Sequence, residues 1–176
     1  MRRACAGGAL GGALWGVVAR VFMRLLSDAP AFSWSGTLVI VGLGTVAGAG
    51  VGLVHGARAA DRTGWWRLAA LPGLLLFVGP GALLVPGAIG MALVLRGRPA
   101  LRVLGALLVV VAPVVLATSS TTAPTPTQVA GLALMVLSTA PLGWAMAEVA
   151  GRWRPKGAAA ESHTVGAPAT ATAAMA

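Results

Sequence analysis

The chain has 176 residues, of which 57% are hydrophobic and only 10% are charged, and its mean hydropathy is +0.87. A soluble domain carries about 25% charged residues, so this composition excludes an ordinary soluble enzyme or binding module and predicts a membrane-embedded helical protein. The net charge of +9 does not indicate nucleic acid binding, because the basic residues flank apolar runs, where they act as topology signals. We therefore expect the lipid bilayer as a partner, and no nucleic acid.

The first apolar segment runs from about Cys5 to Leu26. Three of its glycines, Gly8, Gly12 and Gly16, recur at four-residue spacing. Small residues on one helix face let two membrane helices approach closely, so this row predicts a packing surface. The N-terminal region is also typical of a signal peptide, but the glycine row favours an uncleaved first helix.

The connection that follows carries an unusual placement of charge. Arg20, Arg24 and Asp28 lie four residues apart, so consecutive members are neighbours on one side of a helix, and Trp34 follows them. We expect an ion-paired helix end at the outer surface of the membrane. The alternative is an outward-facing site for an anion or a lipid headgroup.

The same connection contains an Arg-x-x-Met-Arg pattern that begins at Arg20, and the sequence Phe-Ser-Trp-Ser-Gly-Thr that ends at Thr37. This stretch resembles a group of uncharacterised small bacterial multi-pass membrane proteins. The resemblance covers the first third of the chain. It implies an integral membrane location and no known activity.

The second apolar segment runs from about Leu38 to Ala57 and contains a stricter glycine row than the first. Two glycine-lined helices joined by a short connection are expected to pack as a hairpin, in a glycine zipper. The glycines of this second row are Gly44, Gly48, Gly52 and Gly56.

The third apolar run, from Leu68 to Leu95, has 28 residues and contains Gly79-Pro80-Gly81 near its centre. One crossing needs about 20 residues, so the run is long for one helix and short for two. If it crossed once, 5 basic residues would lie on the N-terminal side of the membrane and 8 on the other. If it returns to the side that it left, the count becomes 11 against 2, which the positive-inside rule strongly favours. We therefore predict a helical hairpin, either two short crossings or a re-entrant one, with both termini cytoplasmic.

Two further apolar segments, Val103 to Thr118 and Val129 to Val149, complete the predicted membrane part. The fold class is thus all-α: a transmembrane bundle of four full crossings plus the short or re-entrant hairpin, with up to six transmembrane helices. We expect one transmembrane domain over residues 1–154. An Ala/Thr/Pro-rich, disordered cytoplasmic tail is expected over residues 155–176.

Few residues could carry chemistry. The chain has 4 acidic residues and 2 histidines, with no Gly-x-Ser-x-Gly, His-Glu-x-x-His or P-loop sequence. His55 and Glu148 both fall near the predicted inner ends of their helices and form a candidate polar pair. An ion pair between Glu148 and Arg152, four residues on, is the simpler interpretation. We expect no catalytic site, no metal site and no cofactor.

These observations favour a non-enzymatic packing or accessory component of the bacterial inner membrane, associated with itself or with another membrane protein. The alternative is a small oligomeric transporter or channel built around the Gly79-Pro80-Gly81 hairpin. Against that alternative, the run from Leu68 to Leu95 contains no ionisable residue.

Overall fold

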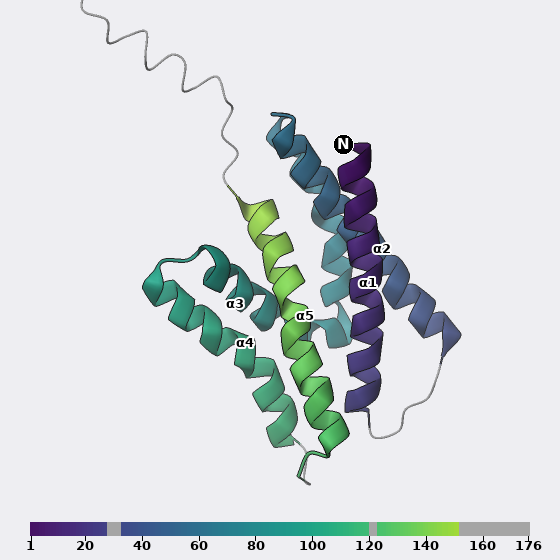
Figure 1. Ribbon diagram of the computed structural model, residues 1–176, viewed down its shortest axis with the longest axis vertical. Coiled ribbons are helices and arrows are strands. Elements are labelled where there is room, and N and C mark those ends of the chain that lie inside the picture. Colours follow the sequence, from purple (N-terminus) through teal and green to yellow (C-terminus); the bar gives the residue numbers. More distant parts are fainter. Residues whose placement is uncertain (28–32, 120–122, 152–176) are drawn as a thin grey trace, which may run out of the picture.

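The computed structural model describes residues 1–27, 33–119 and 123–151, and all regular secondary structure in these ranges is helical. The predicted all-α fold is thereby confirmed. The predicted tail, 155–176, lies outside the described residues. The elements in chain order are α1 (Arg2–Leu26), α2 (Trp34–Ala59), the 3-10 helices η1 (Gly64–Phe77) and η2 (Gly79–Leu83), α3 (Leu84–Arg96), α4 (Pro99–Ser119) and α5 (Pro126–Ala150) (Figure 1).

Several helices begin earlier than the apolar runs indicate, because capping side chains hold their first turns. α2 begins at Trp34 rather than near Leu38, and Ser33 Oγ accepts a hydrogen bond from the Gly36 amide at 3.2 Å. α5 begins directly after Thr125, which forms a capping box with Gln128. Such caps satisfy amide groups that have no partner within the helix.

α1 and α2 pack as an antiparallel hairpin, the most extensive contact between two elements in the fold. A Cβ atom on Gly12 would lie closer than 3.0 Å to the carbonyl oxygen of Gly44, and one on Gly8 would meet that of Gly48 in the same way. Gly8 precedes Gly12 in α1, but its partner Gly48 follows Gly44 in α2, so the two helices are antiparallel. Only glycine permits backbones to approach this closely.

The segment from Gly64 to Arg96 is bent and returns to the end of the bundle from which it starts. η1 and the helix that follows it are inclined by 112°. At one end of the segment, Arg67 donates a hydrogen bond to the carbonyl of Gly151, and at the other Arg96 donates to the carbonyl of Ala147. Both ends of the segment therefore meet the C-terminal end of α5.

The tip of this segment reaches only the middle of the bundle. A Cβ on Gly87, near the start of α3, would lie 2.7 Å from Thr139 Cγ2, at the midpoint of α5. Further along, Gly143 of α5 faces Met91. α3 thus runs parallel to the second half of α5 and does not pass its first half. The segment therefore enters and leaves the bundle at the same end, and we call it the re-entrant segment.

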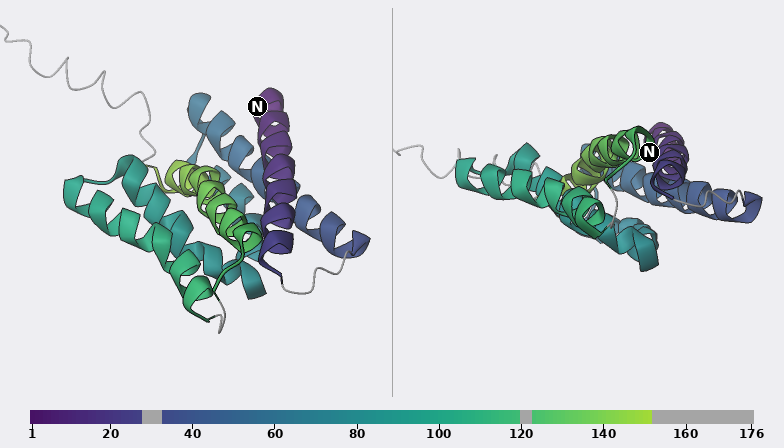
Figure 2. Two further views of the ribbon diagram at one scale, coloured as in Figure 1. Left: turned by 60° about the horizontal axis from the view of Figure 1, so that its bottom comes forward. Right: turned by 90° about the horizontal axis from the view of Figure 1, so that it is seen from below.

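α5 lies between two helical hairpins, α1–α2 on one side and α3–α4 on the other (Figures 1 and 2). Buried side chains from α1, α3, α4 and α5 form a core in the half of the bundle beyond the re-entrant tip. Its members are Trp15, Ala19, Phe22, Leu84, Ala112 and Met135.

Four helices, α1, α2, α4 and α5, are long and apolar enough to cross a membrane. Each of these helices has large apolar side chains that point outward; in α4, for example, Val103 and Leu107 are 64% and 60% exposed. Outward apolar side chains are expected of helices that face lipid, because lipid tails are as apolar as leucine. The composition and exposure of these helices fit a multi-pass membrane protein.

Candidate functional site

The densest group of polar side chains in the described part of the chain surrounds Glu148, in the last turns of α5. Glu148 is 8% exposed, although it lies on a helix whose composition is otherwise that of a membrane span. A buried carboxylate needs cationic or hydrogen-bonding partners, because removal of a lone charge from water costs several kcal/mol or more. The structure supplies these partners from two other helices.

α2 contributes two of the partners from neighbouring positions near its C-terminal end. His55 and Arg58 lie three residues apart and so share a helix face. His55 Nδ1 and Arg58 Nη1 each lie 3.1 Å from Glu148 Oε1. Arg58 Nη1 also donates a hydrogen bond to the backbone carbonyl of Glu148 at 2.8 Å. α2 is thereby joined to α5 through both the side chain and the backbone of one residue.

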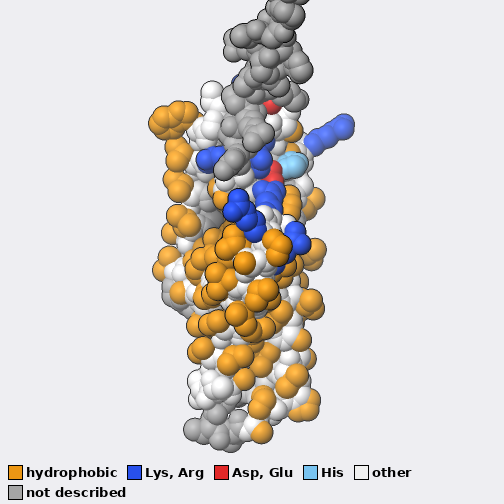
Figure 3. Space-filling view, turned by 90° about the vertical axis from the view of Figure 1, so that its left-hand side faces the viewer, with side chains coloured by type: hydrophobic (Ala, Val, Ile, Leu, Met, Phe, Trp, Pro, Cys, Tyr) orange, Lys and Arg blue, Asp and Glu red, His pale blue; other side chains and the backbone are white. Residues whose placement is uncertain are grey.

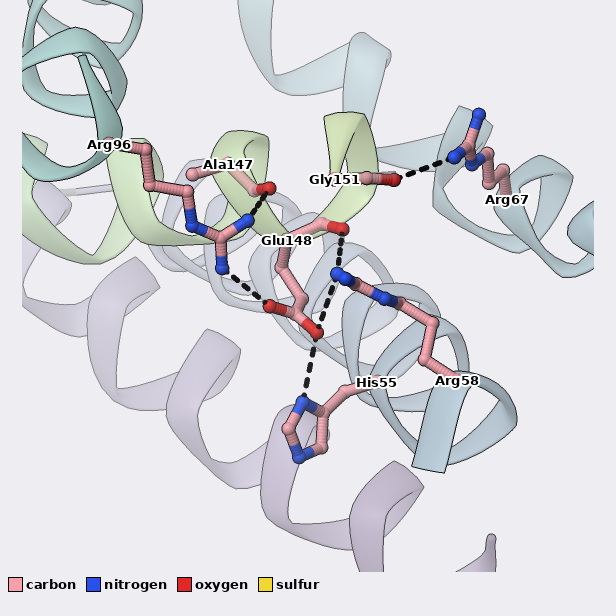
Figure 4. Close-up of polar contacts among 7 residues, drawn as sticks. All are labelled: His55, Arg58, Arg67, Arg96, Ala147, Glu148 and Gly151. Atoms are coloured by element: carbon pink, nitrogen blue, oxygen red, sulfur yellow. Dashed lines mark hydrogen bonds and ion pairs between the residues drawn. The ribbon is translucent and has the colours of Figure 1, made fainter. Parts of the chain in front are cut away.

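The re-entrant segment contributes the other partner, from its last residue. Arg96 Nη2 lies 2.9 Å from Glu148 Oε2, while its Nη1 donates to the carbonyl of Ala147 (Figure 4). Nearby, Arg67 Nη2 at the start of η1 donates to the carbonyl of Gly151 at 2.6 Å. The last carbonyls of a helix carry partial negative charge, so these guanidinium groups complement the C-terminal end of α5.

We call Glu148, His55, Arg58 and Arg96 the Glu148 cluster. Both carboxylate oxygens have partners within the protein: His55 and Arg58 contact Oε1, and Arg96 contacts Oε2. Within the described residues, the cluster holds two guanidinium groups, those of Arg58 and Arg96, against one carboxylate. The local charge is therefore positive. The arrangement can join helices and attract anions.

The basic residues of the bundle gather at the end that holds the Glu148 cluster. Of the ten basic residues in the described ranges, eight lie at this end and only Arg20 and Arg24 lie at the other. In Figure 3, basic side chains gather in the upper part of the view, above an extensive apolar surface. The eight are Arg2, Arg3, Arg58, Arg62, Arg67, Arg96, Arg98 and Arg102.

An open groove of about 290 Å³ lies next to the cluster, between α1, α2 and α5. It runs from Trp15, in the middle of the bundle, to Ala4 and His55 at the basic end. His55 is half exposed, and its ring lies 6.1 Å from that of Trp144, which also lines the groove. His55 thus connects the Glu148 cluster with an otherwise apolar depression.

The predicted outer element is described only in part, because Asp28 lies outside the described residues. Arg20 Nε donates a hydrogen bond to Thr37 Oγ1 at 3.1 Å, which joins the end of α1 to the start of α2. Trp34 is 72% exposed. Whether this element is purely structural or binds a headgroup stays a prediction.

The glycines of the two predicted rows differ in what they contact. Gly8, Gly12, Gly44, Gly48 and Gly52 all face backbone of the opposite helix at distances that exclude a Cβ atom. Gly16 keeps to this pattern, whereas Gly56 departs from it. A Cβ on Gly16 would lie 2.8 Å from Val41 Cα, whereas one on Gly56 would lie 3.1 Å from Ala4 Cβ, a tight side-chain contact.

The sequence pattern paired His55 with Glu148 but missed Arg58, Arg67 and Arg96 as partners. The three-residue spacing of His55 and Arg58 was a usable signal, since it places both on one helix face. No local pattern connects Arg96 with α5, because the two meet only through the re-entrant path of the chain. Arg152, the partner expected for Glu148, lies outside the described residues.

No known protein family, curated protein or solved structure matches this chain. Within the described residues, no group of three or more His, Cys, Asp or Glu side chains could hold a metal ion. The function must therefore be argued from the arrangement of the helices and their polar contacts.

Proposed function

We propose that the protein is a non-enzymatic packing or accessory component of the bacterial inner membrane. The observation that carries this proposal is the Glu148 cluster, in which the buried carboxylate is engaged by side chains from α2 and α3. A catalytic carboxylate needs access to a substrate, whereas Glu148 is directed at its own protein partners. Its geometry suits a residue that holds helices together.

The orientation that we propose places both termini in the cytoplasm. The support is the eight basic residues at one end of the described bundle against two at the other. Basic residues are retained on the cytoplasmic side during insertion. The Glu148 cluster would then lie at the inner membrane surface, and the loop before α5 would face outward.

The glycine rows of α1 and α2 would act as a glycine zipper that sets the shape of the N-terminal hairpin. Close backbone contacts at Gly12 and Gly44 support this role. The expected partners are the lipid bilayer and either a second copy of the chain or another membrane protein.

The re-entrant segment favours a second candidate function, a small oligomeric transporter or channel. Helices that end within a membrane are typical of transporters and channels, where half-helix ends or backbone carbonyls contact the permeating species. Here the tip lies beside the middle of α5, near Ser138 and Thr139. Both hydroxyl groups donate to carbonyls of their own helix, which leaves them poorly placed to contact a solute.

Reconstitution of the full chain into liposomes distinguishes the two functions. The liposomes would carry a pH-sensitive dye and, separately, a potassium gradient with a voltage-sensitive dye. The packing function predicts flux equal to that of empty liposomes, both for the natural chain and for Glu148→Gln. Flux above that of empty liposomes that disappears in Gly81→Leu would favour the transporter or channel instead, because a Cβ at Gly81 would collide with the carbonyl of Leu76.

A further inference from the structure

The groove between α1, α2 and α5, of about 290 Å³, is left unfilled by the chain and reaches the basic end of the bundle. Gly7 and Gly11 of α1 line it, and a Cβ added at either would meet no atom within 4 Å. Their neighbours Gly8 and Gly12, by contrast, contact α2 closely. α1 thus uses adjacent positions for two surfaces, one closed against α2 and one open to the membrane.

The walls of the groove are apolar along its length and become polar only at one end. Val51, Leu142 and Ala145 line its middle, and Trp15 and Leu76 close it near the centre of the bundle. From Ala4 to Trp15 the lining of α1 extends over about 16 Å at 1.5 Å per residue. An acyl chain that lies along the bundle axis has this elongated, apolar shape.

The polar end of the groove carries positive charge. His55 lines the groove, and Arg58 contacts the same oxygen of Glu148 as His55 does, so the two side chains are neighbours. Within the described residues, Glu148 supplies one carboxylate against two guanidinium groups, those of Arg58 and Arg96. A phosphate at this position would complement the excess charge through charge-assisted hydrogen bonds. Basic pockets between membrane helices bind anionic lipid headgroups for this reason.

We propose that this groove binds one anionic phospholipid, with an acyl chain along Gly7 and Gly11 and the phosphate beside His55 and Arg58. The inference goes beyond the proposed function, because it assigns a ligand and needs only that the chain is embedded in a membrane. A second groove, of about 330 Å³, adjoins the first, since Val51, Leu142 and Ala145 line both, and it serves as an internal comparison. Its lining, which includes Leu74 and Met146, contains no ionisable residue. Headgroup selectivity therefore belongs to the first groove.

The test uses the full chain in dodecyl maltoside and measures Tm with added dioleoylphosphatidylglycerol, dioleoylphosphatidylcholine or inorganic phosphate. The two lipids have the same acyl chains and differ in headgroup charge. The expected result is a rise of roughly 5 °C with saturating phosphatidylglycerol, a clearly smaller rise with phosphatidylcholine and none with phosphate. Equal rises with the two lipids would overturn the headgroup assignment. A rise with phosphate alone would show an ion site without a lipid site.

Matched variants locate the lipid. Gly11→Leu fills the groove without touching the α1–α2 contact and should abolish the selective rise, whereas Gly42→Leu, which also points into open space but outside the groove, should retain it. His55→Gln and Arg58→Gln should each reduce it, and Arg98→Gln should not. Native mass spectrometry should show one retained phosphatidylglycerol that Gly11→Leu loses. A selective rise that persists in Gly11→Leu would overturn the proposal even if Arg58→Gln fails to fold.

Discussion

Arg96 and Glu148 are 52 residues apart in the sequence, yet Arg96 Nη2 lies 2.9 Å from Glu148 Oε2. The contact joins the last residue of the re-entrant segment to the last turns of α5. It also fixes where the segment ends, since an arginine at the far side of the membrane could not reach this carboxylate. This ion pair therefore holds the end of the segment from Gly64 to Arg96 at the C-terminal end of α5.

This ion pair should contribute to stability through coupling between its partners. Arg96→Gln and Glu148→Gln should each lower the Tm in detergent, and the double variant should be more stable than the sum of the single effects implies. Because Arg96 is 44% exposed, solvent screens part of the interaction. We expect a coupling free energy of about 1 kcal/mol. Arg98→Gln, which changes an exposed charge nearby, is the control, and additive effects of the two substitutions would contradict the assignment.

Substitution of glycine should destabilise the α1–α2 hairpin at the positions where the two helices touch and should be tolerated elsewhere. Gly48→Ile and Gly52→Ile should each lower the Tm strongly or cause aggregation, because a Cβ there would collide with backbone of α1. Gly42→Ile should be tolerated, since a Cβ at Gly42 meets nothing within 4 Å. Size-exclusion profiles and Tm values check this. Similar behaviour of all three variants would show that the glycine row does not hold the hairpin together.

A buried hydrogen bond between α1 and α5 should be measurable at Trp15. Its Nε1 donates to the carbonyl of Ser138 at 3.0 Å, in the core of the bundle. Trp15→Phe removes the donor and some packing, so we expect a loss of about 1–3 kcal/mol in stability. Trp65→Phe, at a position that is 78% exposed, is the control. An unchanged Tm for Trp15→Phe would argue against this contact.

The outer end of the hairpin should depend on Arg20 and Thr37 together. Arg20→Ala and Thr37→Val should each lower the free energy of unfolding by about 1 kcal/mol, and the double variant should lose less than the sum of the two, because both remove the same hydrogen bond. This outcome fits a structural helix end. Stabilisation by phosphate-bearing lipid that vanishes specifically in Arg20→Ala would instead make Arg20, Arg24 and Trp34 a headgroup site.

The number and place of the helices could be predicted because apolar runs of about 20 residues have few alternatives in a membrane. The glycine rows likewise indicated that α1 and α2 would meet, since small residues at four-residue spacing define one helix face. The basic residues indicated that the segment from Leu68 to Leu95 returns. Each of these predictions depends on a short stretch of sequence or on a count of residues, and none needs a contact between distant segments.

Other features could not be predicted, because they depend on contacts between distant segments. The partners of Glu148 are brought together by the re-entrant path and share no sequence spacing with it. The 3-10 conformation of η1 was also missed. Pro72 in its middle lacks an amide hydrogen and disfavours an α-helix, yet long 3-10 stretches are too uncommon to expect. The division of α1 into a closed and an open glycine row likewise depends on the position of α5.

We infer that the segment between Arg62 and Arg98 returns to the side of the membrane on which it starts. Cysteine accessibility tests it most directly. Cys5, the only cysteine, would be replaced by alanine, and single cysteines placed at Arg62, Arg98 and Ala123. A membrane-impermeant maleimide would then be applied to spheroplasts and to inverted vesicles. Arg62→Cys and Arg98→Cys should react only in inverted vesicles, and Ala123→Cys only in spheroplasts. Reaction of Arg62→Cys and Arg98→Cys from opposite sides would contradict it.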